Sequence, residues 1–189
     1  MAPAGNFECL HAAIQGGADS VYFGVEKLNM RSHSANNFKM SDLKEICEIC
    51  RSNGVKTYLT LNIVLYNEDL EDMRKTLEAA KEAGITAVIA SDMAAIIYAR
   101  NIGLEVHIST QLSISNAESL RFYAQFADVI VLARELNLNQ VKEIKSIIDR
   151  DDIKGPSGRK VEIEMFAHGA LCMAISGKCY LSLHEYGAS

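Results

Sequence analysis

The chain has 189 residues, of which 49% are hydrophobic and 23% are charged, a composition typical of one globular domain without a low-complexity tract. With a formal net charge of −5 and no cluster of Lys and Arg, it lacks the basic face of a protein that grips a nucleic-acid backbone. No stretch is apolar enough to cross a bilayer, no signal peptide is visible, and five cysteines without a secretory pattern favour a cytoplasmic protein without disulfides.

Strands and helices alternate along the chain about seven times. A helical segment ends in a glycine such as Gly54 or Gly84, and a β-branched or aromatic run begins a few residues later. The strands are expected at 20–24, 56–63, 87–91, 105–110, 128–133 and 161–169, with a fragment of another at 1–4. The helices are expected before Gly17 and at 41–52, 68–83, 92–102, 115–126 and 137–148. The helix 115–126 opens with capping-box spacing from Ser115 to Glu118.

This alternation predicts an α/β fold with a parallel sheet. Polar residues follow nearly every strand, as Asn62, Asp92, Gln111 and His168 show. A closed barrel builds its site from all of its strand ends, whereas an open doubly wound sheet concentrates function at one point, so we expect a TIM-like (β/α) barrel in a single domain over residues 1–189. Because eight units take about 250 residues, the barrel is expected to be incomplete and truncated at both ends. Its unclosed strand edges would favour self-association.

Polar side chains at this rim are the candidate catalytic residues. His168 ends the last predicted strand and is the histidine best placed for a site. Arg134 can clamp a carboxylate or phosphate with two hydrogen bonds, or form an ion pair with Glu135 at the rim. Glu164 alternates with Glu162 and faces the same side, and an inward carboxylate needs a partner such as Arg134. We therefore assign catalytic roles to His168, Glu164 and Arg134.

A second group of polar residues is expected to bind substrate. Its members are hydrogen-bonding groups at the ends of the predicted strands 56–63, 105–110 and 128–133, a histidine within the strand 105–110, and the one arginine of the polar loop 29–38. For the histidine, core packing and substrate contact are both open. The predicted substrate-binding residues are Asn62, His107, Ser109, Gln111, Glu135 and Arg31.

Two cysteines near the end of the chain are the strongest chemical signal. Cys172 and Cys179 are seven residues apart, which puts both thiols on one face if the segment is helical. Thiolates suit a metal or an iron–sulfur cluster, although cysteines alone are more often small buried hydrophobes. Cys47 and Cys50 form a C-x-x-C inside a predicted helix and are expected to be buried, and Cys9 on the first helix is expected to lie in the core.

The stretch around the late cysteines resembles the signature of the peptidase U32 family. The pattern E-x-F-x-x-G-x-L-C-x-x-x-x-G-x-C-x-x-S runs from Glu164 to Ser182 and fixes eight positions over nineteen residues. The stretches 2–6, 17–24, 107–116 and 131–137 look like further blocks of the same family. The resemblance therefore covers the whole chain, as the N-terminal barrel portion of a longer protein.

The resemblance implies an enzyme. The family carries the label of a collagenase-like peptidase, but several members act in hydroxylation of a tRNA uridine, of an rRNA cytidine or of ubiquinone precursors. Those members resemble one another in holding a 4Fe–4S cluster on four cysteines, the first two of which fall on Cys172 and Cys179, while the other two would follow Ser189. The resemblance thus implies Fe–S-dependent hydroxylation of an RNA base, with RNA or a small organic cosubstrate as partner.

Two alternatives remain. A collagenase-like peptidase has little support from the residues, because His184-Glu185 is followed by Ala188 where an HExxH zinc motif needs a second histidine. No GxSxG motif occurs, and a Cys–His pair is conceivable only from Cys172 with His168. The second alternative is a non-catalytic barrel that binds a partner through its rim.

Overall fold

The computed structural model describes residues 1–29, 38–169, 174–175 and 179. It divides into two compact units, Met1–Glu105 and Val106–Ser189. In each unit parallel strands alternate with helices, which confirms the α/β class predicted from the sequence. None of the helices in the described ranges has the length and apolar character needed to cross a membrane.

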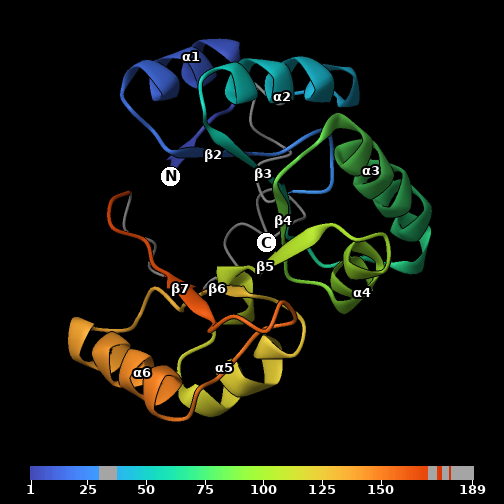
Figure 1. Ribbon diagram of the computed structural model, residues 1–189. Helices are drawn as coiled ribbons and strands as arrows, with labels where there is room; N and C mark the ends of the chain where they lie inside the picture. Colours follow the sequence, from blue (N-terminus) through green and yellow to red (C-terminus); the bar gives the residue numbers. More distant parts are fainter. Residues whose placement is uncertain (30–37, 170–173, 176–178, 180–189) are drawn as a thin grey trace. The chain divides into compact units, whose positions relative to one another are not determined.

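The first unit has four parallel strands, which pair in the order β1, β2, β3 and β4. Figure 1 shows helices α1 to α4 following one another along one side of these strands. In chain order the elements are β1 (Ala2–Pro3), α1 (Phe7–Gln15), β2 (Ser20–Phe23), the 3-10 turn η1 (Met40–Asp42), α2 (Leu43–Ser52), β3 (Lys56–Leu61), the 3-10 turn η2 (Asn67–Asp69), α3 (Leu70–Ala83), β4 (Ala87–Ala90) and α4 (Met93–Asn101).

The predicted helices of this unit are all present, but two begin later than expected. Short 3-10 turns precede α2 and α3, so Asn67 opens a turn and α3 begins at Leu70 rather than at residue 68. Asp69 closes that turn by accepting from the backbone N–H of Tyr66 at 2.8 Å. Asp92 does cap α4 as predicted, accepting from the backbone N–H of Ala94 at 2.8 Å.

The two faces of the first unit's strands differ in character. Thr57, Leu59 and Leu61 alternate along β3 and are buried, and the thiol of Cys47 on α2 bonds to Thr57, so this face is turned toward the helices. The opposite face, called here the inner face of the first unit, carries Tyr58 and Thr60. Tyr58 aligns with Tyr22 on β2. The inner face therefore mixes aromatic and polar groups, while the helix side is mainly apolar, with Thr57 as its polar member.

The second unit contains three parallel strands, paired in the order β5, β6 and β7. Its elements are β5 (Glu105–Ile108, the first residue of which closes the first unit), the 3-10 turn η3 (Thr110–Leu112), α5 (Ala117–Ala124), β6 (Val129–Val131), α6 (Leu138–Arg150) and β7 (Glu162–Glu164). Figure 1 shows α5 and α6 side by side along β6 and β7.

The register of β5 with β6 and of β6 with β7 fixes the two faces of the second unit's strands. Ile108, Ile130 and Ile163 share one face, and the first two are fully buried. The side chains that α5 and α6 bury are also apolar, Leu120 and Ile144 among them, so the helices cover the isoleucine face. The opposite face is called here the inner face of the second unit.

Two predictions about element ends in this unit are wrong. The cap of α5 is Asn116 rather than Ser115, because the Asn116 side chain accepts from the backbone N–H of Ser119 at 2.9 Å. Strand β7 ends at Glu164 rather than at Gly169, and the residues after it, such as Phe166, are exposed and outside the parallel ladder.

The cysteines of the first unit separate into two groups. Cys47 and Cys50 are buried on α2, as predicted for an apolar helix face. Burial raises the pKa of both thiols, that of Cys50 to about 11. The prediction for Cys9 is wrong, because α1 turns Leu10 into the core and leaves Cys9 exposed.

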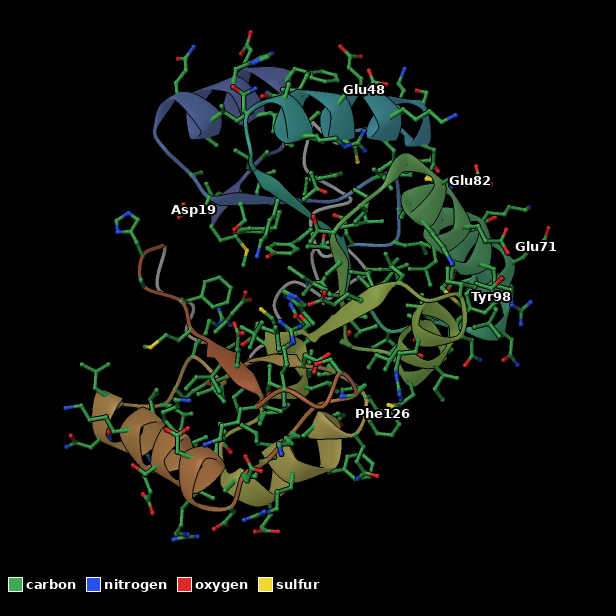
Figure 2. The ribbon with its side chains drawn as sticks, in the orientation of Figure 1. Asp19, Glu48, Glu71, Glu82, Tyr98 and Phe126 are labelled. Atoms are coloured by element: carbon green, nitrogen blue, oxygen red, sulfur yellow. The ribbon has the colours of Figure 1, made fainter. Side chains whose placement is uncertain are left out.

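The outer sides of the helices carry the charge expected of solvent-facing surfaces. Glu48 on α2 and Glu71 and Glu82 on α3 are exposed, and Figure 2 shows them pointing away from the strands. Glu71 pairs with Lys75 one turn along the same helix, with 2.6 Å between the carboxylate and ammonium groups. Chemistry is therefore better sought on the inner faces than on the helix surfaces.

Candidate functional site

The candidate site is built on the inner face of the second unit. Alternation along the strands puts His107 of β5 and both Glu162 and Glu164 of β7 on this face. Ser109 follows two residues after His107 and continues the same side beyond the end of β5. Four polar residues from two strands thus share one face, on which Val129 and Val131 of the intervening strand are the apolar members.

His107 and Glu164 form the central pair of the site. The distance from His107 Nδ1 to Glu164 Oε1 is 3.7 Å, and the two side chains are 3% and 26% exposed. Burial raises the pKa of the Glu164 carboxyl above its usual 4.5, and the nearby Glu162 carboxylate raises it further. A carboxyl with a raised pKa beside a histidine can hold and exchange a proton, so the pair has the chemistry of a general acid and base.

A second polar pair lies at the end of β5. The Ser109 hydroxyl donates to Gln111 Oε1, and Ser109 is only 2% exposed. Gln111 sits in the η3 turn, which is fastened to the end of β6. Thr110 Oγ1 donates to the carbonyl of Leu132 at 3.1 Å, and the backbone N–H of Ala133 donates to the carbonyl of Ile114 at 2.9 Å. The η3 turn is therefore joined to the end of β6 by hydrogen bonds at Thr110 and at Ile114.

Ser113, which closes this turn, has two features that cost free energy. Ser113 has left-handed backbone angles, with φ of 50° and ψ of 44°, which only glycine adopts without cost. Its hydroxyl oxygen is buried without a hydrogen-bond partner among the described residues. Strain of this kind persists where the surrounding contacts hold the backbone in place. The hydrogen bonds between the η3 turn and the end of β6 do this here.

The remaining predicted catalytic residues lie apart from this pair. Arg134, expected to neutralise Glu164, is exposed in a turn three residues beyond the last residue of β6, Val131. Glu164 lies beside His107 instead, with 3.7 Å between Oε1 and Nδ1. His168 is exposed, four residues after the end of β7.

The predicted substrate-binding residues divide in a similar way. His107, Ser109 and Gln111 come together in the second unit, while Glu135 is exposed beside Arg134. Asn62 is half-buried just after β3 in the first unit, where it continues the inner face of that unit beyond Thr60. Arg31 lies outside the described residues.

Only one of the two predicted cluster ligands can be described. Cys179 is half-buried and reduced, and Cys172 lies outside the described residues. Thiol chemistry suits an iron–sulfur cluster, so the donor type fits the predicted group. In the described part of the chain, no three His, Cys, Asp or Glu side chains are grouped closely enough to hold a metal ion.

Sequence reasoning missed several inner-face residues. Tyr22 and Tyr58 align on neighbouring strands of the first unit, and Tyr58 packs with Ala87 and Ile89. The spacing of two from Tyr58 to Thr60 and Asn62 was the available signal, because alternate residues of a strand share a face. Thr110 was also missed, and no local pattern reveals its bond to Leu132.

Comparison with known proteins identifies the family. The model of peptidase family U32 matches residues 5–189. The chain belongs to peptidase family U32. The resemblance read from the cysteine signature is therefore confirmed over nearly the whole chain.

The named relatives of this family fall into two kinds. A collagenase of Porphyromonas gingivalis is 65% identical over all of this chain and 46% of its own length. The tRNA hydroxylation protein P1 of Bacillus subtilis is 37% identical over 97% of this chain and 42% of its own length. A 23S rRNA 5-hydroxycytidine synthase of Escherichia coli is 34% identical over all of this chain and 27% of its own length. The chain thus spans less than half the length of these relatives.

Solved structures confirm the fold. A U32 peptidase aligns with a TM-score of 0.65 at 15% identity, covering 87% of this chain and 65% of the other. 2,3-Dimethylmalate lyase, a member of the PEP mutase/isocitrate lyase superfamily, aligns with a TM-score of 0.54 at 14% identity, covering 92% and 68%. The predicted fold class, an incomplete TIM-like (β/α) barrel with seven strands in the described residues, is therefore correct.

Proposed function

We propose that the full-length protein is an iron–sulfur-dependent enzyme that hydroxylates a base in RNA. The observation that carries the proposal is the His107–Glu164 pair, a buried histidine beside a carboxyl of raised pKa on the inner face of the second unit. Hydroxylation replaces a ring hydrogen by a hydroxyl group. This is a two-electron oxidation, for which we assign the supply of the oxygen atom and the uptake of the two electrons to the small organic cosubstrate, and the ring carbon gives up a proton in the process. Family relatives named for tRNA and rRNA hydroxylation support RNA as the substrate.

In this proposal Glu164 accepts the proton and His107 shares it. Raising the pKa of a carboxyl makes its ionised form a stronger base, and a positioned base contributes about 10²–10⁴ in rate. His107, whose Nδ1 lies 3.7 Å from Glu164 Oε1, can relay the proton onward. Ser109 and Gln111 bind the substrate beside this pair, with RNA or a small organic cosubstrate as partner.

Cys172 and Cys179 would hold the cluster. They supply two of the four thiolates of a 4Fe–4S cluster, and we place the other two in the rest of the full-length protein, because Cys47 and Cys50 are buried on α2. When bound, the cluster supplies one-electron redox chemistry. A reducing cytoplasm suits both the cluster and the thiolates that would hold it.

Two measurements test the proposal on the full-length protein. RNA from a strain lacking the gene is digested to nucleosides and analysed by mass spectrometry, before and after complementation. A hydroxylated nucleoside that returns only with the gene supports the proposal, and an unchanged nucleoside profile contradicts it. Protein purified without oxygen should contain iron and sulfide and lose both in Cys172→Ala and Cys179→Ala, whereas Cys9→Ala, a change at an exposed cysteine, should keep them.

Collagenolytic activity is the second candidate, because the Porphyromonas gingivalis relative at 65% identity is named a collagenase. The site geometry supports this reading less well. A serine nucleophile needs a base to take its proton, but the Ser109 hydroxyl donates to Gln111. Incubating the full-length protein with gelatin decides between the two readings, with Cys172→Ala as the control. Cleavage by the wild type that the variant loses would favour the peptidase.

A further inference from the structure

The inner-face residues of β6 lie between the two members of the His107–Glu164 pair. His107 on β5 aligns with Val129 on β6, and Glu164 on β7 aligns with Val131. Alternation along the strand puts both valines on the same face as the pair. A line from His107 to Glu164 therefore crosses β6 between Val129 and Val131, which are 8% and 7% exposed.

The two side chains of the pair must lean across β6 to meet. Neighbouring strands lie about 4.8 Å apart and two residues along a strand span about 6.6 Å, which puts the Cα atoms of His107 and Glu164 roughly 10–12 Å apart. Their side-chain atoms Nδ1 and Oε1 are nevertheless separated by only 3.7 Å. The backbone of Glu164 is bonded to β6, because its carbonyl accepts from the N–H of Leu132 at 2.9 Å. The pair therefore meets over the valines of β6.

A valine suits position 131 in two ways. Its side chain is short and stiff at χ1, so it leaves room for the two longer side chains that meet over the strand. Its methyl groups offer the carboxyl no hydrogen bond and exclude water, and burial of this kind raises the pKa of Glu164. On strands β5 to β7, the other titratable group of the inner face is Glu162, which is exposed.

We propose that Val131 is a positioning residue for the His107–Glu164 pair, short enough to let the two side chains meet over β6 and apolar enough to keep a competing side-chain donor away from the carboxyl. A longer residue at position 131 would separate the pair. A polar residue of the same shape would stabilise the ionised carboxylate. A role of Val131 in hydroxylation rests on the proposed function, whereas the placement of the pair does not.

The first test follows the Glu164 carboxyl and does not depend on hydroxylation. Full-length protein is labelled with ¹³C at the side-chain carboxyls of glutamate, and the Glu164 resonance, assigned by its loss in Glu164→Gln, is followed as the pH changes. Val131→Thr keeps the shape but adds a hydroxyl donor, so Glu164 should titrate at lower pH than in the wild type. Val106→Thr, the same change at a buried valine on the opposite face of β5, should leave the titration unchanged. An unchanged titration in Val131→Thr would overturn the inference.

A double-mutant cycle tests the contact between the two side chains. His107→Gln should shift the Glu164 titration, because the two groups lie 3.7 Å apart. In a Val131→Leu background the same change should have a much smaller effect, since the longer side chain separates the pair. An equal effect in both backgrounds would show that Val131 does not set the contact. Circular dichroism verifies that each variant is folded, and Val131→Thr alone decides if Val131→Leu does not fold.

The second test measures hydroxylated nucleoside in a gene-deletion strain that expresses variants of the full-length protein at limiting levels. Val131→Leu should lower it roughly 10-fold to 100-fold, because a displaced catalytic group loses most of its effect. Val131→Thr should lower it roughly 3-fold to 10-fold, because a carboxyl that ionises more easily is a weaker base. Val106→Thr should stay close to the wild type. Wild-type levels in both Val131 variants would refute a role in the reaction. If the wild type itself makes no hydroxylated nucleoside, the proposed function fails and the titration alone decides the placement of the pair.

Discussion

Replacing Gly24 with alanine is expected to destabilise the protein, because Asn29 occupies the space that a Cβ atom would need. A Cβ built on Gly24 lies 2.3 Å from Asn29 Cγ, whereas ordinary contact begins at 3.4 Å, so the side chain must move by 1.1 Å (3.4 − 2.3). Asn29 is 1% exposed, and its Nδ2 donates to the carbonyls of Val25 at 3.2 Å and Glu26 at 3.3 Å. The displacement would break both bonds.

The cost can be worked from these contacts. Two hydrogen bonds contribute about 1 kcal/mol each, and overpacking a buried site costs about 1–3 kcal/mol more. Gly24→Ala should therefore lower the free energy of unfolding by about 2–5 kcal/mol, and the melting temperature by roughly 5–15 °C for a domain of this size.

A double-mutant cycle tests the cause rather than the cost alone. Asn29→Ala by itself should cost about 1–3 kcal/mol, because two carbonyls lose a donor. In that background the Asn29 amide atoms that crowd the new Cβ are gone, and the lower backbone entropy of the unfolded chain makes Gly24→Ala neutral or stabilising by about 0.5 kcal/mol. Urea unfolding followed by circular dichroism measures all four proteins. An equal cost of Gly24→Ala in both backgrounds would refute the steric explanation.

Three further predictions concern stability and reactivity. Because the pKa of Glu164 is raised in the folded state, its stabilising contribution is complete below pH 4.5 and is lost as the pH rises through the raised value. Glu164→Gln should therefore gain stability relative to the wild type as the pH rises. Urea unfolding measures the difference in free energy of unfolding between the two proteins, and a difference that stays constant between about pH 4 and about pH 8 would contradict this. With iodoacetamide near neutral pH, exposed Cys9 should be alkylated first and Cys50, whose pKa burial raises to about 11, much more slowly, as peptide mass spectrometry will show. Ser113→Gly should stabilise the fold by about 0.5–1 kcal/mol and Ser113→Val should destabilise it by about 1–2 kcal/mol, because only glycine accepts the left-handed backbone without cost; equal melting temperatures for the two variants would show that the turn is unstrained.

The elements themselves could be predicted from local signals. Apolar runs marked each strand, and Asp92 and Asn137 both cap helices as their positions predicted. The limits of β7 could not be found in this way, because the apolar residues after Glu164 look like strand residues while the ladder with β6 ends at Val131. Where pairing ends depends on the partner strand, which one strand's own sequence does not contain.

Residues of the candidate site could be selected from the sequence, but the contacts between them could not. Glu164 and His107 were both selected, but the carboxylate was assigned to Arg134, which is closer to it in sequence. The registers of β5 with β6 and of β6 with β7 decide the true pairing, and Arg134 falls beyond the end of its strand. The hydrogen bond between Ser109 and Gln111 likewise depends on side-chain rotamers, which no sequence pattern specifies.

The measurement that tests the central claim most directly compares two carboxylates on the same strand. Full-length protein carrying Glu164→Gln or Glu162→Gln is expressed in the gene-deletion strain, and hydroxylated nucleoside in its RNA is quantified by mass spectrometry. We expect Glu164→Gln to reduce the nucleoside by about 100-fold or more, and Glu162→Gln, which removes only the neighbouring charge that raises the Glu164 pKa, to cause a much smaller loss. Full restoration by Glu164→Gln would show that the His107–Glu164 pair is not the site of the chemistry.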